Sequence, residues 1–407
     1  MLENFAKSIG ANRAVLALSF ARLADAMGNS ILFIIIPLYV AKLPEVLFHL
    51  PVPVQVGILI SLYGFMNSFL QPIMGALTDR LGRRKILIQI GLALIGICTV
   101  AFVFAQRFVD LLVLRSLQGV AVAITIPASM AIMAAITEKS TRGGSMGIYA
   151  TFRVVGFSIG PLLGGFLKVH WGFNAAFFVG AGLIFLAMLL VQIWVDDVRI
   201  PKENIQARPV RIIDTSLLSP GIFTAALSTF LMAAAFSMVS ALENEFNARL
   251  SINALGFGIA FSSLMVGRLL FQVPLGHLSD RIGRRPIILI GLLFTVPAII
   301  LLGEVTTLWQ FVAIRLFQGI AAAAIAAPAF AVAADLSSYG GEGRQMSIIT
   351  MGFGLGIATG PLIAGILSIA FFELPFLAIG GMTLLGLLVV YWYLPETVKQ
   401  ESPPFNR

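Results

Sequence analysis

The stretch Gly75-Ala-Leu-Thr-Asp-Arg-Leu-Gly-Arg-Arg84 decides the fold, because it returns 201 positions later as Gly276-His-Leu-Ser-Asp-Arg-Ile-Gly-Arg-Arg285. Each copy places one aspartate and three arginines between long apolar runs. Self-similarity at so long a period indicates a duplicated architecture. We therefore expect two homologous halves.

Further residues recur in the same order and at nearly the same offset. Arg115, Gln118 and Gly119 return as Arg315, Gln318 and Gly319, Pro127 returns as Pro328, and Gly156, Gly160, Pro161 and Gly165 return as Gly356, Gly360, Pro361 and Gly365. The duplication therefore extends over most of the chain.

The composition excludes a water-soluble protein. Of the 407 residues, 58% are hydrophobic and only 11% are charged, and the mean hydropathy is +0.97. A water-facing surface needs far more charge. The formal net charge of +8 does not indicate a nucleic-acid partner, because lysines and arginines form short clusters between apolar runs, as topology signals do.

The apolar runs have the length of membrane-spanning helices. A helix needs about 20 mainly apolar residues to cross a hydrocarbon core about 30 Å thick. By that measure the chain holds twelve spans, at 14–40, 54–76, 86–106, 109–135, 146–168, 172–194, 218–241, 254–276, 287–303, 308–334, 346–370 and 374–394. Lipid cannot satisfy the unpaired backbone groups of open strands. The predicted fold class is therefore an all-α integral membrane protein.

The charges between the spans predict the topology. Most lysines and arginines fall on one side of the membrane, and the exceptions are Lys42, Arg107, Lys168 and Arg249. By the positive-inside rule both termini are expected in the cytoplasm.

A polar stretch at 196–216 divides six predicted helices from six. We interpret it as a cytoplasmic linker between an N-terminal bundle, 1–195, and a C-terminal bundle, 217–407. Because six is an even number, both bundles enter the membrane from the same side, related by a pseudo-twofold axis along the membrane normal. A solute site is expected between them, near the midplane.

These residues resemble the major facilitator superfamily over essentially the whole chain. The stretch from Gly75 to Lys85 is similar to the signature that this family places between helices 2 and 3, and the residues from Arg115 to Gly119 resemble its helix 4 motif. The residues from Gly156 to Gly165 resemble its helix 5 motif, which is associated with antiporters. Asp25-Ala-Met-Gly28, with Pro37 twelve residues after the aspartate, is similar to the tetracycline and multidrug proton antiporters. The resemblance implies a transporter of the cytoplasmic (inner) membrane that works by alternating access, usually as a monomer.

The resemblance makes the repeated stretch a gating motif, formed by Gly75, Asp79, Arg80, Gly82, Arg83, Arg84, Asp280, Arg281 and Arg284. Asp79 and Arg83 are four residues apart, as are Asp280 and Arg284, so each pair can form an ion pair at a helix end. The family's interpretation is a latch between the halves, and the alternative is that the arginines anchor the loop to anionic lipid. Where the family carries an acid at the end of helix 4, the first half has Ala135, with Glu138 nearby as a candidate substitute, whereas Asp335 keeps the acid in the second half.

The helix 5 motif is a predicted packing motif. Gly156, Gly160, Gly164 and Gly165 lie at helical spacing, which allows helix backbones to approach closely, and Pro161 removes a backbone hydrogen bond and permits a bend. Antiport is implied by the resemblance alone.

Charged residues inside spans usually face a cavity or a partner. Here they are Arg22, Asp25, Arg115, Arg153, Arg268 and Arg315. Asp25 is our candidate proton carrier, with Arg22 and Arg115 as coupling partners, because burial favours the protonated acid and a nearby arginine favours the carboxylate. The alternative is a structural pair, since Arg22 and Asp25 are spaced i, i+3.

Asn29, Arg315 and Glu243 are the candidate residues of the substrate cavity. For Arg315 the alternative is a packing element that bonds to backbone carbonyls, and for Glu243 it is a solvated position near the outer water. The chain has no nucleotide loop, no catalytic constellation and no histidines at ligand spacing, so we expect no enzyme activity, no cofactor and no metal. The proton gradient is the expected energy source.

The sequence therefore predicts a secondary active transporter that exports amphipathic or drug-like small molecules in exchange for protons. The alternative is uptake or facilitated diffusion of a small organic solute such as a sugar or carboxylate, with intramembrane arginines binding the anion. A receptor or lipid scramblase without transport activity is a third possibility. The predicted partners are a small-molecule substrate and membrane lipid, with no nucleic acid.

Overall fold

The computed structural model describes residues 13–43, 50–137, 142–196, 219–336 and 342–398, and within these ranges every regular element is a helix. The helices are α2 (Arg13–Val40), α3 (Val52–Leu81), α4 (Arg84–Ala101), α5 (Phe108–Ile136), α6 (Arg142–Trp194), α7 (Pro220–Ser237), α8 (Glu243–Arg249), α9 (Ala254–Ile282), α10 (Arg284–Gly303), α11 (Leu308–Asp335), α12 (Glu342–Leu367) and α13 (Leu374–Tyr393). Two 3₁₀ turns, η2 (Phe102–Phe104) and η5 (Met238–Leu242), follow α4 and α7.

The twelve predicted spans are confirmed, although α6 contains two of them. Its 53 residues would reach about 80 Å as one straight helix, far more than the roughly 30 Å of a hydrocarbon core. The chain reverses at Gly172, where φ is 86° and ψ is −174°, a conformation open to glycine and strained for other residues. Gly172 therefore separates the predicted spans 146–168 and 172–194.

Three boundaries differ from the prediction because polar residues continue a helix beyond its apolar run. The helix predicted to end at 76 runs on to Leu81 and stops at Gly82, whose φ of 65° caps it, so most of the first gating motif is helical and not loop. The second copy is helical up to Ile282. The helix predicted for 218–241 continues through η5 and α8 to Arg249.

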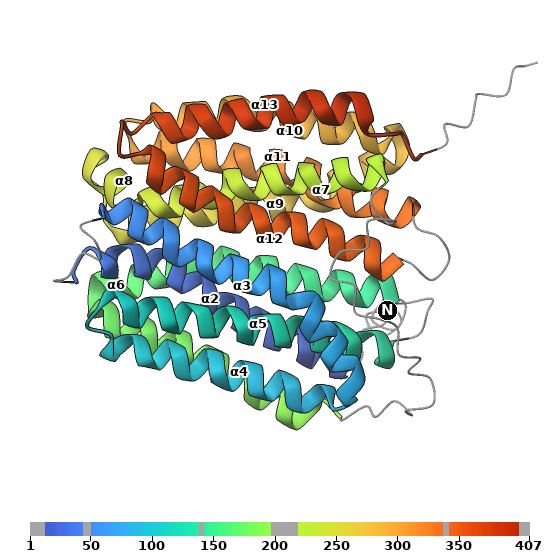
Figure 1. The fold of residues 1–407 in the computed structure, drawn as a ribbon, viewed down its shortest axis with the longest axis horizontal. Helices are drawn as coiled ribbons and strands as arrows, with labels where there is room; N and C mark the ends of the chain where they lie inside the picture. The colour runs from blue at the N-terminus through green and yellow to red at the C-terminus, as the bar shows by residue number, and fades with distance from the viewer. Residues whose placement is uncertain (1–12, 44–49, 138–141, 197–218, 337–341, 399–407) are drawn as a thin grey trace, which may run out of the picture.

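The helices lie side by side as two bundles, α2 to α6 and α7 to α13 (Figure 1). One end of the molecule carries the turns between α3 and α4 and between α9 and α10. We call it the motif end, because both copies of the gating motif lie there. The other end, here the opposite end, carries α8 and the turns that follow α4 and α10. The predicted linker lies outside the described residues except for Asp196, so the domain limits stay a prediction.

The hydrophobic cores show where the bundles meet. One cluster of buried side chains joins both bundles and includes Ile36, Val56, Phe246 and Phe261, all toward the opposite end. Two other clusters belong to one bundle each, the first formed by α2, α4, α5 and α6, the second by α7, α10, α11, α12 and α13. The bundles therefore share a core at the opposite end and have separate cores toward the motif end.

The contacts between the bundles come in symmetric pairs. A methyl group built on Gly57 would lie 2.6 Å from the carbonyl oxygen of Pro361, and one on Gly258 would lie 2.5 Å from that of Pro161. These pairs exchange under the repeat, because Gly57 corresponds to Gly258 and Pro161 to Pro361. Such backbone contact leaves no room for a side chain.

The first helix of each bundle follows the same symmetry. Ser30 of α2 donates to the carbonyl of Gly156 at 3.3 Å, and Ser237 of α7 donates to that of Gly356, also at 3.3 Å. This matches α2 to α7 with an offset of 207 residues, so Pro37 corresponds to Asn244. The Asn244 amide donates to the Pro37 carbonyl at 3.0 Å, and this contact between equivalent positions marks the pseudo-twofold axis near the opposite end.

Candidate functional site

Asp25 lies in the middle of α2 and is 3% exposed. Arg22 donates from Nη1 to its Oδ2 at 2.5 Å, and Asn29 donates from Nδ2 to its Oδ1 at 2.8 Å. The i, i+3 ion pair that the sequence allows is therefore formed, and Asn29 joins it one turn further along the helix. A buried ion pair needs further hydrogen bonds to its remaining atoms. Asn29 supplies one to the second carboxylate oxygen, whereas Arg22 Nε has no partner among the described residues.

Close packing against α6 fixes this turn of α2. A methyl group on Gly156 would lie 2.7 Å from the Leu23 carbonyl oxygen, and one on Gly160 would lie 2.8 Å from that of Met27. These two glycines of the helix 5 motif therefore bring the α6 backbone against the residues on either side of Asp25. The motif thus positions the carboxyl as well as packing two helices.

The remaining residues of the helix 5 motif face in other directions. A methyl group on Gly164 would lie 3.2 Å from Ile31 of α2, within the same bundle. Gly165 lies at the interface between the bundles, where such a group would be 2.4 Å from the Ala254 carbonyl oxygen of α9. Since Pro161 also meets α9, one motif serves both the Asp25 site and the contact between bundles.

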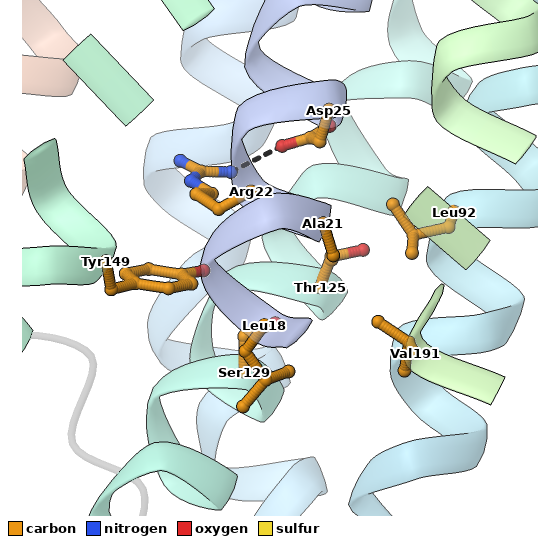
Figure 2. Close-up of a pocket in the computed structure, with 9 residues that line it drawn as sticks. All are labelled: Leu18, Ala21, Arg22, Asp25, Leu92, Thr125, Ser129, Tyr149 and Val191. Carbon is orange, nitrogen blue, oxygen red and sulfur yellow. Dashed lines mark hydrogen bonds and ion pairs between the residues drawn. The ribbon is translucent and has the colours of Figure 1, made fainter. Parts of the chain in front are cut away.

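A small pocket opens beside the ion pair (Figure 2). It is lined by Leu18, Ala21, Arg22, Asp25, Leu92, Thr125, Ser129, Tyr149 and Val191, from α2, α4, α5 and α6. About 10 Å³ is accessible to the centre of a water molecule, roughly room for one water. Leu18 and Ala21 precede Asp25 on α2, so the pocket extends from the carboxyl toward the motif end within the first bundle.

Arg115, the other predicted coupling partner, is 1% exposed and makes no ion pair among the described residues. Its Nη1 donates to Gln118 at 3.2 Å, and its guanidinium carbon lies 5.1 Å from the centre of the Tyr63 ring. Arg22 faces a second tyrosine, Tyr149, at 5.8 Å. Aromatic faces stabilise a buried cation without neutralising it, so Arg115 remains a positive charge in the first bundle.

Two arginines to which the sequence assigned no role converge from different bundles. The guanidinium carbons of Arg153 in α6 and Arg268 in α9 lie 5.5 and 6.0 Å from the centre of one ring, that of Phe353 in α12. Arg268 also donates to Gln272 at 3.3 Å. Neither arginine has a carboxylate within ion-pair distance in the described part of the chain. The two arginines are 115 residues apart in the sequence, and nothing in the sequence indicated that they meet, because Phe353 joins them only in the folded protein.

Arg315 is fully buried in the second bundle, 0% exposed. It donates to the Phe236 carbonyl at 3.4 Å and to Gln318 at 2.8 Å, and its guanidinium lies over the rings of Phe236 and Phe261. This is the geometry of the packing alternative, and the substrate-cavity role of Arg315 stays a prediction.

Replacing Arg315 by methionine tests that interpretation. We expect a substrate KM within about twofold of the wild-type value and a somewhat lower Tm, because an apolar side chain of similar volume replaces a buried charge at small cost while the Gln318 oxygen loses its donor. Transport in proteoliposomes and thermal unfolding measure the two quantities. A KM raised more than about tenfold with unchanged Tm would return Arg315 to the cavity.

Glu243 is not solvated, contrary to the alternative that its place near the outer water suggested. It is 0% exposed, because η5 and α8 continue the helix and place it inside the core that the bundles share. The sequence could not show this, since the polar residues around it resemble the end of a span.

The gating motif is resolved in its second copy. Arg284 forms ion pairs with Asp280 and, at 3.4 Å, with Asp335 of α11. Its backbone N–H donates to Glu396 at 2.9 Å, beyond the end of α13. All these partners belong to the second bundle, so in this conformation the motif connects α9, α11 and the residues after α13 within that bundle.

In the first copy, the side chain of Asp79 lies outside the described residues, and its pairing with Arg83 stays a prediction. Arg84 reaches α5, where it donates to the Ala131 carbonyl at 2.9 Å. Within the described ranges, no three His, Cys, Asp or Glu side chains gather where they could share a metal ion.

Comparison with known proteins agrees with this architecture. The profile of the Major Facilitator Superfamily matches residues 18–248 and 221–406. The multidrug resistance protein MdtG of Salmonella typhi is 28% identical over 357 residues, which are 86% of this chain and 87% of the relative.

Solved structures show the same fold at low identity. A bacterial homologue of the human lysosomal transporter Spinster, in an inward-facing and occupied conformation, gives a TM-score of 0.78 at 16% identity and covers 93% of this chain and 96% of its own. The nucleoside transporter NupG gives a TM-score of 0.75 at 14% identity, with 94% and 100% covered. Twelve spans in two bundles, a duplicated gating motif and a profile match across nearly the whole length lead to one conclusion: the chain belongs to the Major Facilitator Superfamily and is a membrane transporter, not an enzyme.

Proposed function

We propose that this transporter exports amphipathic, drug-like molecules in exchange for protons, by alternating access. The observation that carries the proposal is the Arg22–Asp25 ion pair, buried beside a water-sized pocket. Protonation of Asp25 breaks the pair, and a cationic substrate near the carboxylate opposes protonation by electrostatic repulsion. Proton and substrate therefore compete, which is the requirement for exchange. The similarity to proteins named for multidrug resistance supports the same direction.

The orientation follows from the positive-inside rule. We place the motif end and both termini in the cytoplasm, with the linker at 196–216 on that side and the protein in the inner membrane as a monomer. The bundles then share a core on the outer side and are separate on the inner side, which corresponds to an inward-facing conformation. In this orientation the water-sized pocket lies on the cytoplasmic side of Asp25. The second gating motif would exchange its partners when the motif end closes.

The proposal is tested by the direction of proton movement when a ligand binds. Purified protein in weakly buffered detergent solution is mixed with a panel of cationic, neutral and anionic amphiphiles, and the pH is followed. We expect proton release with cations such as ethidium. Binding without release, shown by ligand fluorescence, would contradict antiport.

Arg153 and Arg268 favour a second candidate function, uptake of an organic anion. Two cations without carboxylate partners, one from each bundle, suit a carboxylate or phosphate bound between them. An anion near Asp25 favours the protonated carboxyl, so the proton and the anion bind together and are carried in the same direction.

The two candidates therefore predict opposite signs in the same experiment. An anion that uses this pair causes proton uptake on binding, and Arg153→Met with Arg268→Met weakens its binding at least about tenfold, because each charge-assisted hydrogen bond contributes about 1.5–3 kcal/mol. Arg315→Met is the matched control, since it removes a fully buried arginine whose contacts are Phe236, Phe261 and Gln318 of its own bundle. Unchanged anion affinity in the double variant would remove the second candidate.

A further inference from the structure

Glu243 is a buried acid without a partner. It is 0% exposed, and neither carboxylate oxygen has a hydrogen-bond partner among the described residues. It is the first residue of α8, directly after the 3₁₀ turn η5, where the helix changes its geometry. Such a break at membrane depth often marks a point where a helix bends.

Glu243 lies where the two bundles close on each other. Its neighbour Asn244 donates to Pro37 of α2 across the pseudo-twofold axis. Ala241, Leu242 and Phe246 belong to the core that both bundles share. Separation of the bundles at this end would bring water to the carboxyl.

The charged groups around Glu243 do not neutralise it. Lys168, from α6 of the other bundle, acts on it electrostatically but forms no ion pair with it, and its ammonium lies 5.8 Å from the centre of the Phe173 ring. Glu245 of α8 adds a second acid, with one buried oxygen that also lacks a partner. Asn247, one turn further along α8, is an uncharged side chain close enough to interact with the carboxyl, although the two make no hydrogen bond of ordinary geometry. Lys42, two residues after the end of α2, lies over the same Phe173 ring at 4.7 Å and forms no ion pair with Glu243. The charged residues within α2 and α9, which also contact α8, lie far from this end.

At the other end of α8, the charged residue Arg249 has an ion-pair partner. Arg249 donates to Glu373 at 2.7 Å, and this hydrogen bond holds the pKa of the Glu373 carboxyl below its usual range. This pair is partly exposed and anchors the last residue of α8. The carboxyl of the first residue is fully buried and has no ion-pair partner among the described residues.

We propose that Glu243 is a second proton-binding site, which takes up a proton when the opposite end closes and releases it when that end opens. A carboxylate buried without a partner costs several kcal/mol, whereas the neutral acid is tolerated. Closure therefore requires the proton, and hydration on opening restores the carboxylate. The proposal rests on alternating access but on neither the substrate nor Asp25.

The proposal predicts that low pH closes the opposite end. The single cysteine, Cys98, is replaced by alanine, and spin labels are attached to Gln106→Cys and Thr306→Cys, exposed positions at this end of the two bundles. Electron double resonance then gives the distance distribution from pH 5.5 to 8.5 without substrate, in sodium-free buffer. We expect the long-distance population to grow as the pH rises.

Glu243→Gln mimics the neutral acid, so the long-distance population should fall at least about tenfold at pH 8.5 and lose its pH dependence. Glu243→Met has no titratable group and a similar volume, and we expect the same result from it. It replaces Glu243→Gln in the experiment if that variant folds poorly. Glu245→Gln is the matched control and should titrate like the wild type.

Three results would overturn the proposal: a wild-type distribution that does not change with pH, a Glu243→Gln variant that titrates like the wild type, or a response to added sodium at constant pH, which would indicate a cation site. Asp25→Asn should keep the distance response. The antiport proposal can therefore fail while the Glu243 proposal holds, and the Glu243 proposal can fail while the antiport proposal holds.

Discussion

Asparagine in place of Asp25 strongly reduces transport driven by a pH gradient, while exchange of substrate for substrate continues. The variant keeps the hydrogen bond from Asn29 and the shape of the side chain but carries no proton, so neither the ion pair with Arg22 nor its proton-dependent breakage remains. We expect gradient-driven accumulation to fall at least about tenfold, equivalent to ~1.4 kcal/mol of coupling free energy. Ethidium transport into inverted proteoliposomes with an imposed pH gradient measures it, and counterflow at uniform pH measures exchange.

Asp110→Asn is the control for this measurement. Asp110 is the acid at the start of α5, where its carboxylate accepts the backbone N–H groups of Gln106 and Arg107 at 3.0 and 2.9 Å. Asparagine can accept the same bonds, so this variant should transport like the wild type. If Asp25→Asn still accumulates substrate against the gradient, Asp25 is a structural partner of Arg22 and the proton carrier lies elsewhere.

Leucine in place of Gly165 prevents closure of the opposite end and stops the transport cycle. A single methyl group there would lie 2.4 Å from the Ala254 carbonyl oxygen, so a larger side chain pushes the bundles apart. Overpacking of a tight contact costs about 1–3 kcal/mol, which shifts the equilibrium toward the opened conformation by about 5- to 150-fold. Gly365→Leu, the symmetric variant against Pro53, should do the same. The spin-label pair at positions 106 and 306 reports the shift.

Gly182→Leu is the matched control on the same helix. A methyl group on Gly182 would meet no atom within 4 Å, and the residue is exposed on the outer surface of α6, where leucine suits lipid. Gly182→Leu should therefore leave both the distances and the transport rate unchanged. A Gly165→Leu variant that also keeps the wild-type distances would show that the bundles meet elsewhere during transport.

The sequence predicted the fold well because the bilayer imposes a simple rule. Each span must satisfy its own backbone, so length and hydropathy suffice to count helices, and the repeat fixes how the halves are related. The same rule failed at the ends of α3, α7 and α9, since a helix does not stop where its apolar residues stop. Gly82 ends α3 through its positive φ, a local conformation that hydropathy does not detect.

The candidate site was only partly predictable. Arg22, Asn29 and Asp25 lie on successive turns of one helix, so their spacing already placed them together. Arg153 and Arg268 come from different bundles and meet at Phe353, a contact set by tertiary packing. Burial of Glu243 depends on the closed interface, and the same residue would be wet if the opposite end were open.

The symmetric contacts at Gly57 and Gly258 also show how the two halves are related. Gly57 contacts Pro361, and its equivalent Gly258 contacts Pro161, the equivalent of Pro361. Two identical chains that meet through an isologous interface show the same pattern. Two copies of one six-helix bundle would form the same pair of contacts with these residues. The acids do not share this symmetry. With the offset that relates α2 to α7, Asp25 corresponds to Met232 and Glu243 to Ile36. The interface between the bundles is therefore duplicated, whereas each acid stands in one half alone.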